Sequence, residues 1–219
     1  MEKYITNAVI FDLDGTVADT LDDLKNSVNY AVGLLGVEPY DRPTVQSFIG
    51  SGAANLIRRA LPAGTDEATA ERILKEFRAH YMAHVMDLTC AYPGVTEMLS
   101  DLKSRGFKLA ITSNKPDAGT KAIADALFPG IFDYVAGEKP DVPRKPAPDM
   151  VRLALEALGE KSAVYVGDSD IDVLTAKNAG LDCICVTWGF RSVDELKAAG
   201  GRVFVSSGDE LSAMVEKQA

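Results

Sequence analysis

The chain has 219 residues, the length of one large domain or of a domain that carries a sizeable insertion. Hydrophobic residues make up 47% of it and charged residues 25%, so the chain can bury a full core and lacks the composition of a disordered protein. The net charge of −9 argues against a nucleic-acid-binding surface, which needs a basic face to displace counterions.

The first residues and the cysteines indicate where the protein works. The stretch MEKYITNAV lacks the hydrophobic region of a signal peptide, and no apolar run approaches the length of a membrane span. Cys90, Cys183 and Cys185 are too few for a disulfide framework, so we expect free thiols, with a metal pair at Cys183 and Cys185 as the lesser alternative. We therefore expect a soluble, cytoplasmic protein with no membrane partner; monomer and homodimer both stay open.

Four short apolar runs predict buried parallel strands, at residues 8–11, 108–112, 163–166 and 183–186. Each run is continuous rather than alternating, as expected where helices cover both faces of a sheet. Helical patterns lie between the runs, and two of them end at Gly106 and Gly159. This order predicts an α/β fold with a Rossmann-like open parallel sheet.

Residues 20 to about 88 interrupt the alternation of strand and helix. Apolar residues recur there at helical spacing, first at Leu21, Leu24, Val28, Val32 and Leu35, and later at Ile73, Phe77, Tyr81 and Val85. No comparable strand-like run intervenes, which favours a small helical bundle. We predict an α/β core domain of residues 1–17 and 89–219 and an inserted helical domain of residues 18–88.

Polar residues follow three of the predicted strands. Asp12 and Asp14 come after the first strand, Ser113 and Asn114 after the second, and Asp168 after the third. Any one of them is ordinary loop material. Because sites in open α/β sheets gather at the carboxyl ends of the strands, we expect these side chains to lie at one edge of the sheet.

The carboxylates of this edge indicate a divalent cation. Asp12 and Asp14 are two residues apart, and Asp168 and Asp172 are one helical turn apart. Mg²⁺ combines a few carboxylates with phosphate oxygens of a substrate, and Lys145 supplies a matching positive charge. A cation, a lysine and neutral donors around acidic oxygens are the components of a phosphoryl-transfer site.

Four motifs in order resemble those of the haloacid dehalogenase superfamily: DLDGT at 12–16, TSNK at 112–115, KPAPD at 145–149 and GDSDID at 167–172. The resemblance covers essentially the whole chain. Two further stretches, FIGSGAANLIRRAL at 48–61 and VTWGF at 186–190, are similar to the phosphoglycolate phosphatase-like branch, which has a helical cap. The resemblance identifies the inserted helical domain as that cap.

The resemblance implies roles for the acidic residues. Asp12 would attack phosphorus and form an aspartyl-phosphate. Asp14 would protonate the leaving oxygen and then activate water as a general base. Asp12, the backbone carbonyl of Asp14, and Asp168 would hold Mg²⁺, with Asp172 supporting them from outside the coordination sphere.

The resemblance also implies substrate contacts. Ser113 and Lys145 would grip the transferring phosphoryl group. Further substrate-binding residues are expected at Thr16 and Asn114 in the core and at Gly50, Gly52 and Arg58 in the cap. Purely structural roles stay open for the cap residues. Gly50 and Gly52 can form the turn at the start of a helix, and Arg58 or Arg59 can lie on a solvent-exposed helix face.

Four other residues admit a competing interpretation. Lys139, in GEKPD, imitates the third motif, but Lys145 fits better because its motif leads directly into a helix. His80 and His84 have a spacing that can bind zinc, yet no third ligand is apparent, and we interpret them as packing or surface residues. Asp170 has no role in the motif, and we expect it in a solvated loop.

The reaction predicted is hydrolysis of a small phosphorylated metabolite, with 2-phosphoglycolate as the leading substrate. Asp14 favours turnover by water, since the cation-pumping ATPases of the superfamily carry Thr there. A pyrophosphatase, a nucleotidase or a sugar-phosphate phosphatase stays open, whereas Gly167 disfavours a β-phosphoglucomutase. The absence of Lys from residues 44–61 argues against carbon–phosphorus cleavage, and the acidic fourth motif against a dehalogenase. A catalytically inactive phospho-metabolite-binding protein is the alternative of a different class.

Overall fold

The structure is a computed structural model that describes residues 3–217. The chain divides into two compact units, one made by residues 1–19 with 91–219 and the other by residues 20–90. Each unit is described by itself below. Their assignment as a catalytic core and a cap stays a prediction.

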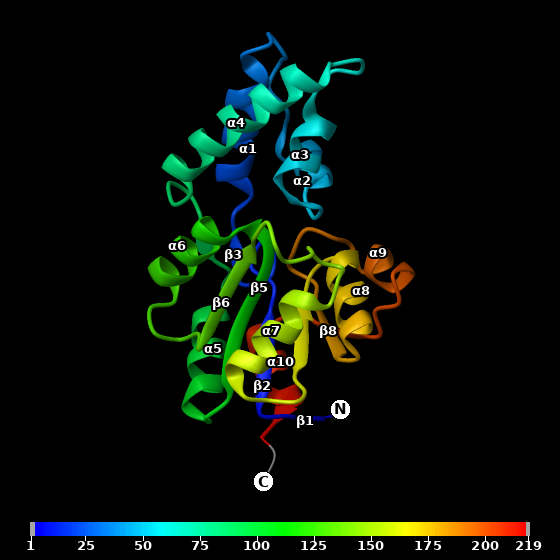
Figure 1. Ribbon diagram of the computed structural model, residues 1–219. Coiled ribbons are helices and arrows are strands. Elements are labelled where there is room, and N and C mark those ends of the chain that lie inside the picture. Colours follow the sequence, from blue (N-terminus) through cyan, green and yellow to red (C-terminus); the bar gives the residue numbers. More distant parts are fainter. Residues whose placement is uncertain (1–2, 218–219) are drawn as a thin grey trace. The chain divides into compact units, whose positions relative to one another are not determined.

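The first unit contains a six-stranded parallel sheet (Figure 1), which confirms the predicted fold class. Its strand order is β6-β5-β2-β7-β8-β9. The bounds are β2 Ala8–Phe11, β5 Lys108–Pro116, β6 Tyr134–Glu138, β7 Val164–Gly167, β8 Asp182–Val186 and β9 Val203–Val205. The central strand β2 is entirely buried, as a strand with helices on both faces must be.

The described part of this unit has six helices: α5 Val95–Ser104, α6 Asp117–Leu127, α7 Asp149–Leu158, α8 Asp170–Ala179, α9 Val193–Ala198 and α10 Gly208–Met214. Helices α7 and α8 cover one face, where Val151 and Ala176 pack with Ile10 and Tyr165 in a single buried cluster. Helices α5 and α10 pack against each other and lie behind the sheet in Figure 1. Gly159 ends α7 with a left-handed φ of 67°, as predicted.

Residues 3–217 also contain two short strand pairs. Strand β1 (Tyr4–Ile5) pairs with β10 (Val215–Glu216), and β3 (Ala18–Asp19) pairs with β4 (Cys90–Ala91). The sequence did not predict them because two-residue strands carry no hydrophobic periodicity.

The second unit is built from four helices: α1 Leu21–Gly33, α2 Arg42–Phe48, α3 Gly52–Ala60 and α4 Glu67–His84. Helices α1 and α4 pack together, and all but one of the residues predicted to form their apolar stripes are buried. The exception is Leu35, which is partly buried in the turn that follows α1. Asp41 and Asp66 cap α2 and α4 by accepting hydrogen bonds from Thr44 N and Thr69 N.

A buried carboxylate ties the two ends of this unit together. Asp23, in the first turn of α1, is 1% exposed. It accepts hydrogen bonds from Leu88 N at 3.0 Å, Thr89 N at 2.8 Å and Thr89 Oγ1 at 2.8 Å. The carboxylate therefore fixes the chain that leaves α4 against the start of α1.

The histidines pack within the second unit. His80 stacks on Tyr30 and on His84, and its Nδ1 lies 3.0 Å from Ser27 Oγ. His84 Nδ1 lies 2.7 Å from Asp87 Oδ2. Burial and the neighbouring His84 lower the pKa of His80. These contacts agree with packing or surface histidines rather than with zinc ligands.

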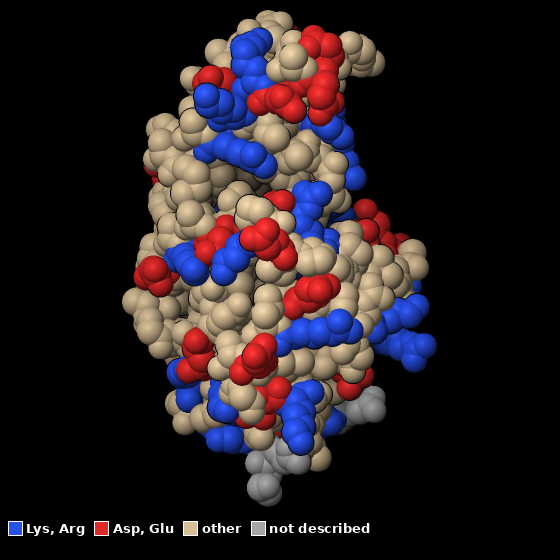
Figure 2. All heavy atoms as spheres, viewed as in Figure 1, with Lys and Arg blue, Asp and Glu red and all other residues tan. Residues whose placement is uncertain are grey.

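The described cysteines are free thiols, with Cys185 buried and Cys90 exposed. Charged side chains of both signs are interspersed over the face seen in Figure 2. Among residues 3–217, no helix has both the length and the apolar character needed to cross a bilayer.

Candidate active site

The chain leaves β2 through a tight loop that presents Asp12 and Asp14. Asp12 N donates to Val166 O at 2.9 Å, so Asp12 continues the sheet pairing for one residue beyond the strand. The carbonyl of Leu13 then accepts hydrogen bonds from Val17 N and Ala18 N. This wrapping fixes the backbone on either side of Asp14.

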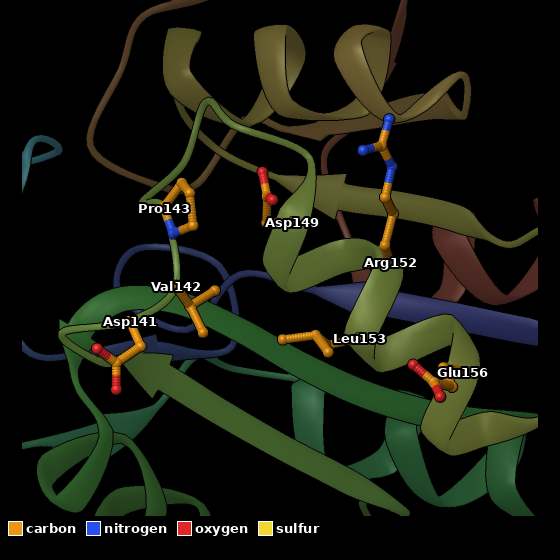
Figure 3. Close-up of a pocket in the computed structure, with 7 residues that line it drawn as sticks. All are labelled: Asp141, Val142, Pro143, Asp149, Arg152, Leu153 and Glu156. Carbon is orange, nitrogen blue, oxygen red and sulfur yellow. The ribbon is translucent and has the colours of Figure 1, made fainter.

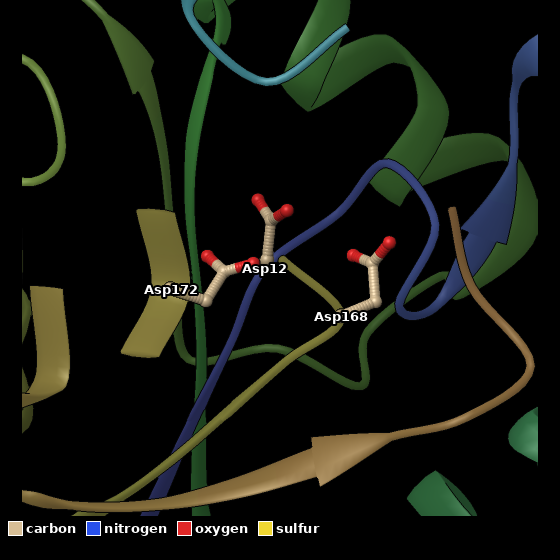
Figure 4. Close-up of side chains that lie close together, drawn as sticks. All are labelled: Asp12, Asp168 and Asp172. Atoms are coloured by element: carbon tan, nitrogen blue, oxygen red, sulfur yellow. The ribbon is translucent and has the colours of Figure 1, made fainter. Parts of the chain in front are cut away.

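Three buried carboxylates converge at the edge of the sheet (Figure 4). Asp12, Asp168 and Asp172 offer oxygens that all lie within 4.8 Å of one another, and Figure 4 shows Asp12 between the other two. Burial raises the pKa of Asp12 well above its ordinary value and that of Asp168 to about 7, and the charge of Asp172 adds to both shifts. Like charges this close need a cation to stay ionised together at neutral pH.

Lys145 supplies one positive charge to this cluster. Its Nζ lies 2.8 Å from Asp12 Oδ1, 2.8 Å from Asp172 Oδ1 and 3.0 Å from the hydroxyl of Tyr165. Burial favours the neutral amine, but the two carboxylates outweigh it and hold the pKa of Lys145 well above its ordinary value. The Lys139 side chain is 45% exposed, and its Nζ lies 3.7 Å from Asp117 Oδ1, which is not part of the cluster. The structure thus brings Lys145, and not Lys139, to the carboxylates.

Asn114 anchors the segment that carries Lys145. Its amide nitrogen donates to Lys145 O at 3.0 Å, and its amide oxygen accepts from Lys145 N at 2.9 Å. The sequence predicted a substrate contact here, and the structure shows a two-bond clamp on the backbone of Lys145. Ser113, 2% exposed, precedes it in β5 at the same edge of the sheet.

Asp172 is oriented by the first turn of α8. It forms a capping box with Ser169, whose backbone N and Oγ donate to Asp172 Oδ2 at 3.1 and 2.6 Å. A Cβ on Gly167 would collide with the Asp172 side chain, so the residue before Asp168 must be glycine. Asp170 begins the same helix rather than lying in a loop as expected, and its side chain, 47% exposed, is 3.7 Å from Arg191.

Asp168 is held from two sides. Thr16 Oγ1 donates to its Oδ1 at 2.9 Å, and Phe190 N donates to its Oδ2 at 2.7 Å. A side chain on Gly189 would collide with the same carboxylate. Thr16 was predicted to bind substrate, and the structure shows it orienting an acidic residue of the cluster.

Two buried residues of the site were not predicted. Tyr165 OH lies near Lys145 Nζ, Asp172 and Thr112 Oγ1, the last at 3.2 Å. Lys115 Nζ lies 2.8 Å from Asp14 Oδ1. The sequence carried no signal for Tyr165, which lies in an apolar strand. Lys115 could have been predicted, because it is the last residue of the TSNK motif.

The predicted substrate-binding residues Gly50, Gly52 and Arg58 belong to the second unit. Gly50 and Gly52 have φ values of 122° and 81°, which only glycine adopts readily. Arg58 Nη2 pairs with Glu67 at 2.5 Å. Their role toward a substrate stays a prediction.

A separate hollow of about 320 Å³ lies beside α7 (Figure 3). It contains none of the predicted site residues. Its lining consists of Asp141, Val142, Pro143, Asp149, Arg152, Leu153 and Glu156. Three carboxylates against one arginine do not suit a phosphate ester.

The carboxylate cluster fits Mg²⁺ on the chemistry of its donors. The described residues offer one group of His, Cys, Asp and Glu side chains close enough to share a metal, and it consists only of carboxylates. Mg²⁺ prefers such oxygen ligands. Asp12 and Asp168 are the residues that would hold it.

Comparison with known proteins places this site in a family. The family model for haloacid dehalogenase-like hydrolases matches residues 9–186. A phosphoglycolate phosphatase of Cereibacter sphaeroides is 37% identical over 187 residues, which are 84% of this chain and 86% of that protein. A phosphoglycolate phosphatase of Aquifex aeolicus is 36% identical, over 83% of this chain and 85% of that protein.

A solved structure shares the fold over nearly its full length. It comes from Lactobacillus delbrueckii subsp. bulgaricus and is provisionally described as a phosphoglycolate phosphatase. It superposes with a TM-score of 0.90 at 34% identity, covering 95% of this chain and 98% of that one. The chain therefore belongs to the haloacid dehalogenase-like hydrolases, as its four motifs predicted, and is a phosphoric monoester hydrolase.

Proposed function

We propose that this enzyme hydrolyses 2-phosphoglycolate through an aspartyl-phosphate on Asp12, with Mg²⁺ as cofactor. The observation that carries the proposal is the contact between Lys145 Nζ and Asp12 Oδ1 at 2.8 Å inside a cluster of buried carboxylates. The contact favours an anionic Asp12 oxygen, as a nucleophile requires, against the burial and the neighbouring carboxylates that raise the pKa of Asp12. Bound Mg²⁺ would cancel the remaining repulsion and draw charge from the phosphate oxygens.

The proposed reaction has two steps. An oxygen of Asp12 attacks phosphorus, the bond from phosphorus to the ester oxygen breaks, and Asp14 gives its proton to that oxygen. Asp14, now ionised, takes a proton from water, whose oxygen attacks phosphorus. The bond from Asp12 to phosphorus breaks, and inorganic phosphate leaves with Asp12 restored.

The other core residues hold the phosphoryl group and the site around it. Lys145 is placed to stabilise the charge of the phosphoryl oxygens, because electrostatic stabilisation supplies most of the catalysis in phosphoryl transfer. Ser113 adds a hydroxyl donor from β5. Asn114, Thr16 and Ser169 hold Lys145, Asp168 and Asp172 through the hydrogen bonds described above.

The relatives support 2-phosphoglycolate as the substrate, since both sequence relatives named above are phosphoglycolate phosphatases. This substrate carries a carboxylate besides its phosphate. An arginine fork suits a carboxylate, and Arg58 of the second unit is the predicted partner. Its present ion pair with Glu67 is exposed on both sides and therefore weak enough to exchange.

A panel of phosphate compounds tests the proposal. With Mg²⁺, we expect kcat/KM for 2-phosphoglycolate to exceed the values for sugar phosphates, nucleotides and pyrophosphate, and Asp12→Asn to abolish turnover. A tenfold preference for pyrophosphate, on the order of 1.4 kcal/mol, would overturn the substrate and leave the mechanism standing. Undiminished turnover by Asp12→Asn would overturn the mechanism. A folded protein inactive on every compound would favour a phospho-metabolite-binding protein.

A further inference from the structure

A second buried ion pair lies at the site and takes no part in the carboxylate cluster. Lys115 Nζ is 2.8 Å from Asp14 Oδ1, and the two side chains are 2% and 14% exposed. The nearest comparable lysine in the sequence, Lys121, pairs with Asp117 at the same distance but is 49% exposed. A lysine is rarely buried unless it is paired, so the contact with Asp14 explains why Lys115 lies inside.

The end of β5 is shaped to direct Lys115 at the site. Ser113, Asn114 and Lys115 are all buried where β5 reaches the carboxyl edge of the sheet. The register between β5 and β6 shifts between Thr112 and Pro116, as at a β-bulge or a similar irregularity of the strand. Bulges re-aim side chains next to active sites.

The backbone of Lys115 is fixed on both sides. Its N donates to Ser113 Oγ at 3.2 Å, and its O accepts from Thr120 Oγ1 at 3.2 Å. Gly137 lies so close to Lys115 O that a side chain there would collide with it. A lysine held this firmly presents its ammonium group at a defined place.

We propose that Lys115 is a positioning residue for Asp14. The inference rests on the proposed function, in which Asp14 protonates the leaving oxygen and later takes a proton from water. Both transfers need the carboxylate at the same place, within hydrogen-bond reach of the reacting oxygen. The short pair holds Asp14 beside Asp12, and a loss of about 1 Å in placement can cost on the order of 10²-fold in rate.

The inference separates Lys115 from Lys145. Lys145 contacts the nucleophile and supports its attack, whereas Lys115 contacts Asp14 and supports the steps in which a proton moves. With p-nitrophenyl phosphate, the leaving anion is stable without a proton. Formation of the aspartyl-phosphate then needs little help from Asp14, and its hydrolysis still needs the base.

Rapid-quench kinetics on Lys115→Met and Lys115→Gln test the inference. With p-nitrophenyl phosphate and Mg²⁺, we expect a burst of p-nitrophenolate at nearly the wild-type rate and slower decay of the phosphoenzyme by about 10²-fold. Because decay then limits turnover, kcat and KM should fall together and kcat/KM should change little. Lys121→Met is the matched control and should behave as wild type. Lys115→Arg keeps a cation at the position and should recover part of the decay rate.

A double variant decides whether Lys115 acts through Asp14. If it does, Asp14→Asn with Lys115→Met should decay within about twofold of Asp14→Asn alone, because the second change removes nothing further. Additive losses, or a slow burst with a raised KM, would show a lysine that grips the substrate and would overturn the inference. Wild-type decay in both neutral variants would also overturn it. Inactivity of the wild-type enzyme would instead refute the proposed function.

Discussion

Substituting Lys145 by Met removes the positive charge from the carboxylate cluster and keeps most of the apolar stem. The ammonium group lies 2.8 Å from both Asp12 Oδ1 and Asp172 Oδ1, and the side chain is 2% exposed. Without it, the oxygens of Asp12, Asp168 and Asp172 remain within 4.8 Å of one another with no opposing charge from Lys145. The variant should therefore be destabilised at any pH where the carboxylates ionise.

The size of the loss follows from the burial of the pair. Removing one partner of a buried ion pair costs about 3–5 kcal/mol, and Lys145 has two such partners, so we expect about 4 kcal/mol at pH 8 without Mg²⁺. For a chain of this length, that corresponds to a fall in Tm of roughly 8–16 °C. At pH 5 the carboxylates of the variant can take up protons, so the loss should shrink.

Thermal unfolding in EDTA at both pH values measures the effect. Lys139→Met is the control, because Lys139 is 45% exposed and 3.7 Å from Asp117 and should contribute less than about 1 kcal/mol. Equal stabilities of the two variants at pH 8 would refute the reasoning. So would a loss in Lys145→Met that does not depend on pH.

Three further predictions concern Asp168, the cation and Asp23. Because the pKa of Asp168 rises to about 7 from 3.8, the cation-free folded chain keeps a proton that the unfolded chain loses, so stability should fall as pH rises from about 4 to 7. Mg²⁺ needs ionised carboxylates, so calorimetric titration at pH 6 should show proton release as a dependence on buffer, and its absence would contradict the site. Asp23→Ala should lower the free energy of unfolding by about 3 kcal/mol, because it leaves the hydrogen-bond donors of Leu88 and Thr89 without their acceptor. Asp22→Ala is the control and should cost under about 1 kcal/mol, because the Asp22 carboxylate is 39% exposed. Equal losses in chemical denaturation would contradict the role of Asp23.

The central part of the fold was predictable from continuous apolar runs. Strands β2, β7, β8 and the first part of β5 fall where those runs lie, because strands buried on both faces are mainly apolar. Strand β5 continues past the predicted run to Pro116, through the buried polar residues of the site. Strands β6 and β9 were missed. Both are edge strands of the sheet and are only partly buried, so neither needs a continuous apolar run. Tyr134–Glu138 includes a glycine and a glutamate, and Val203–Val205 has only three residues.

The acidic residues of the site were predictable, and the contacts that hold them were not. Asp12 and Asp168 stand out because charges directly after buried strands are costly without a purpose. Tyr165 gave no such signal, because a tyrosine in an apolar strand is usually a core residue. Only the structure shows that its hydroxyl lies beside Lys145 Nζ. The direction of Lys115 depends on the register shift between β5 and β6, which is a property of strand pairing and leaves no trace in the local sequence.

Trapping the phosphoenzyme tests the central claim most directly. Asp14→Asn treated with p-nitrophenyl phosphate and Mg²⁺, quenched in acid and analysed by peptide mass spectrometry, should carry one phosphoryl group, on Asp12. The same treatment of Asp12→Asn should give an unmodified chain. A phosphoryl group on any other residue, or none in Asp14→Asn while the wild-type enzyme turns over, would contradict the account.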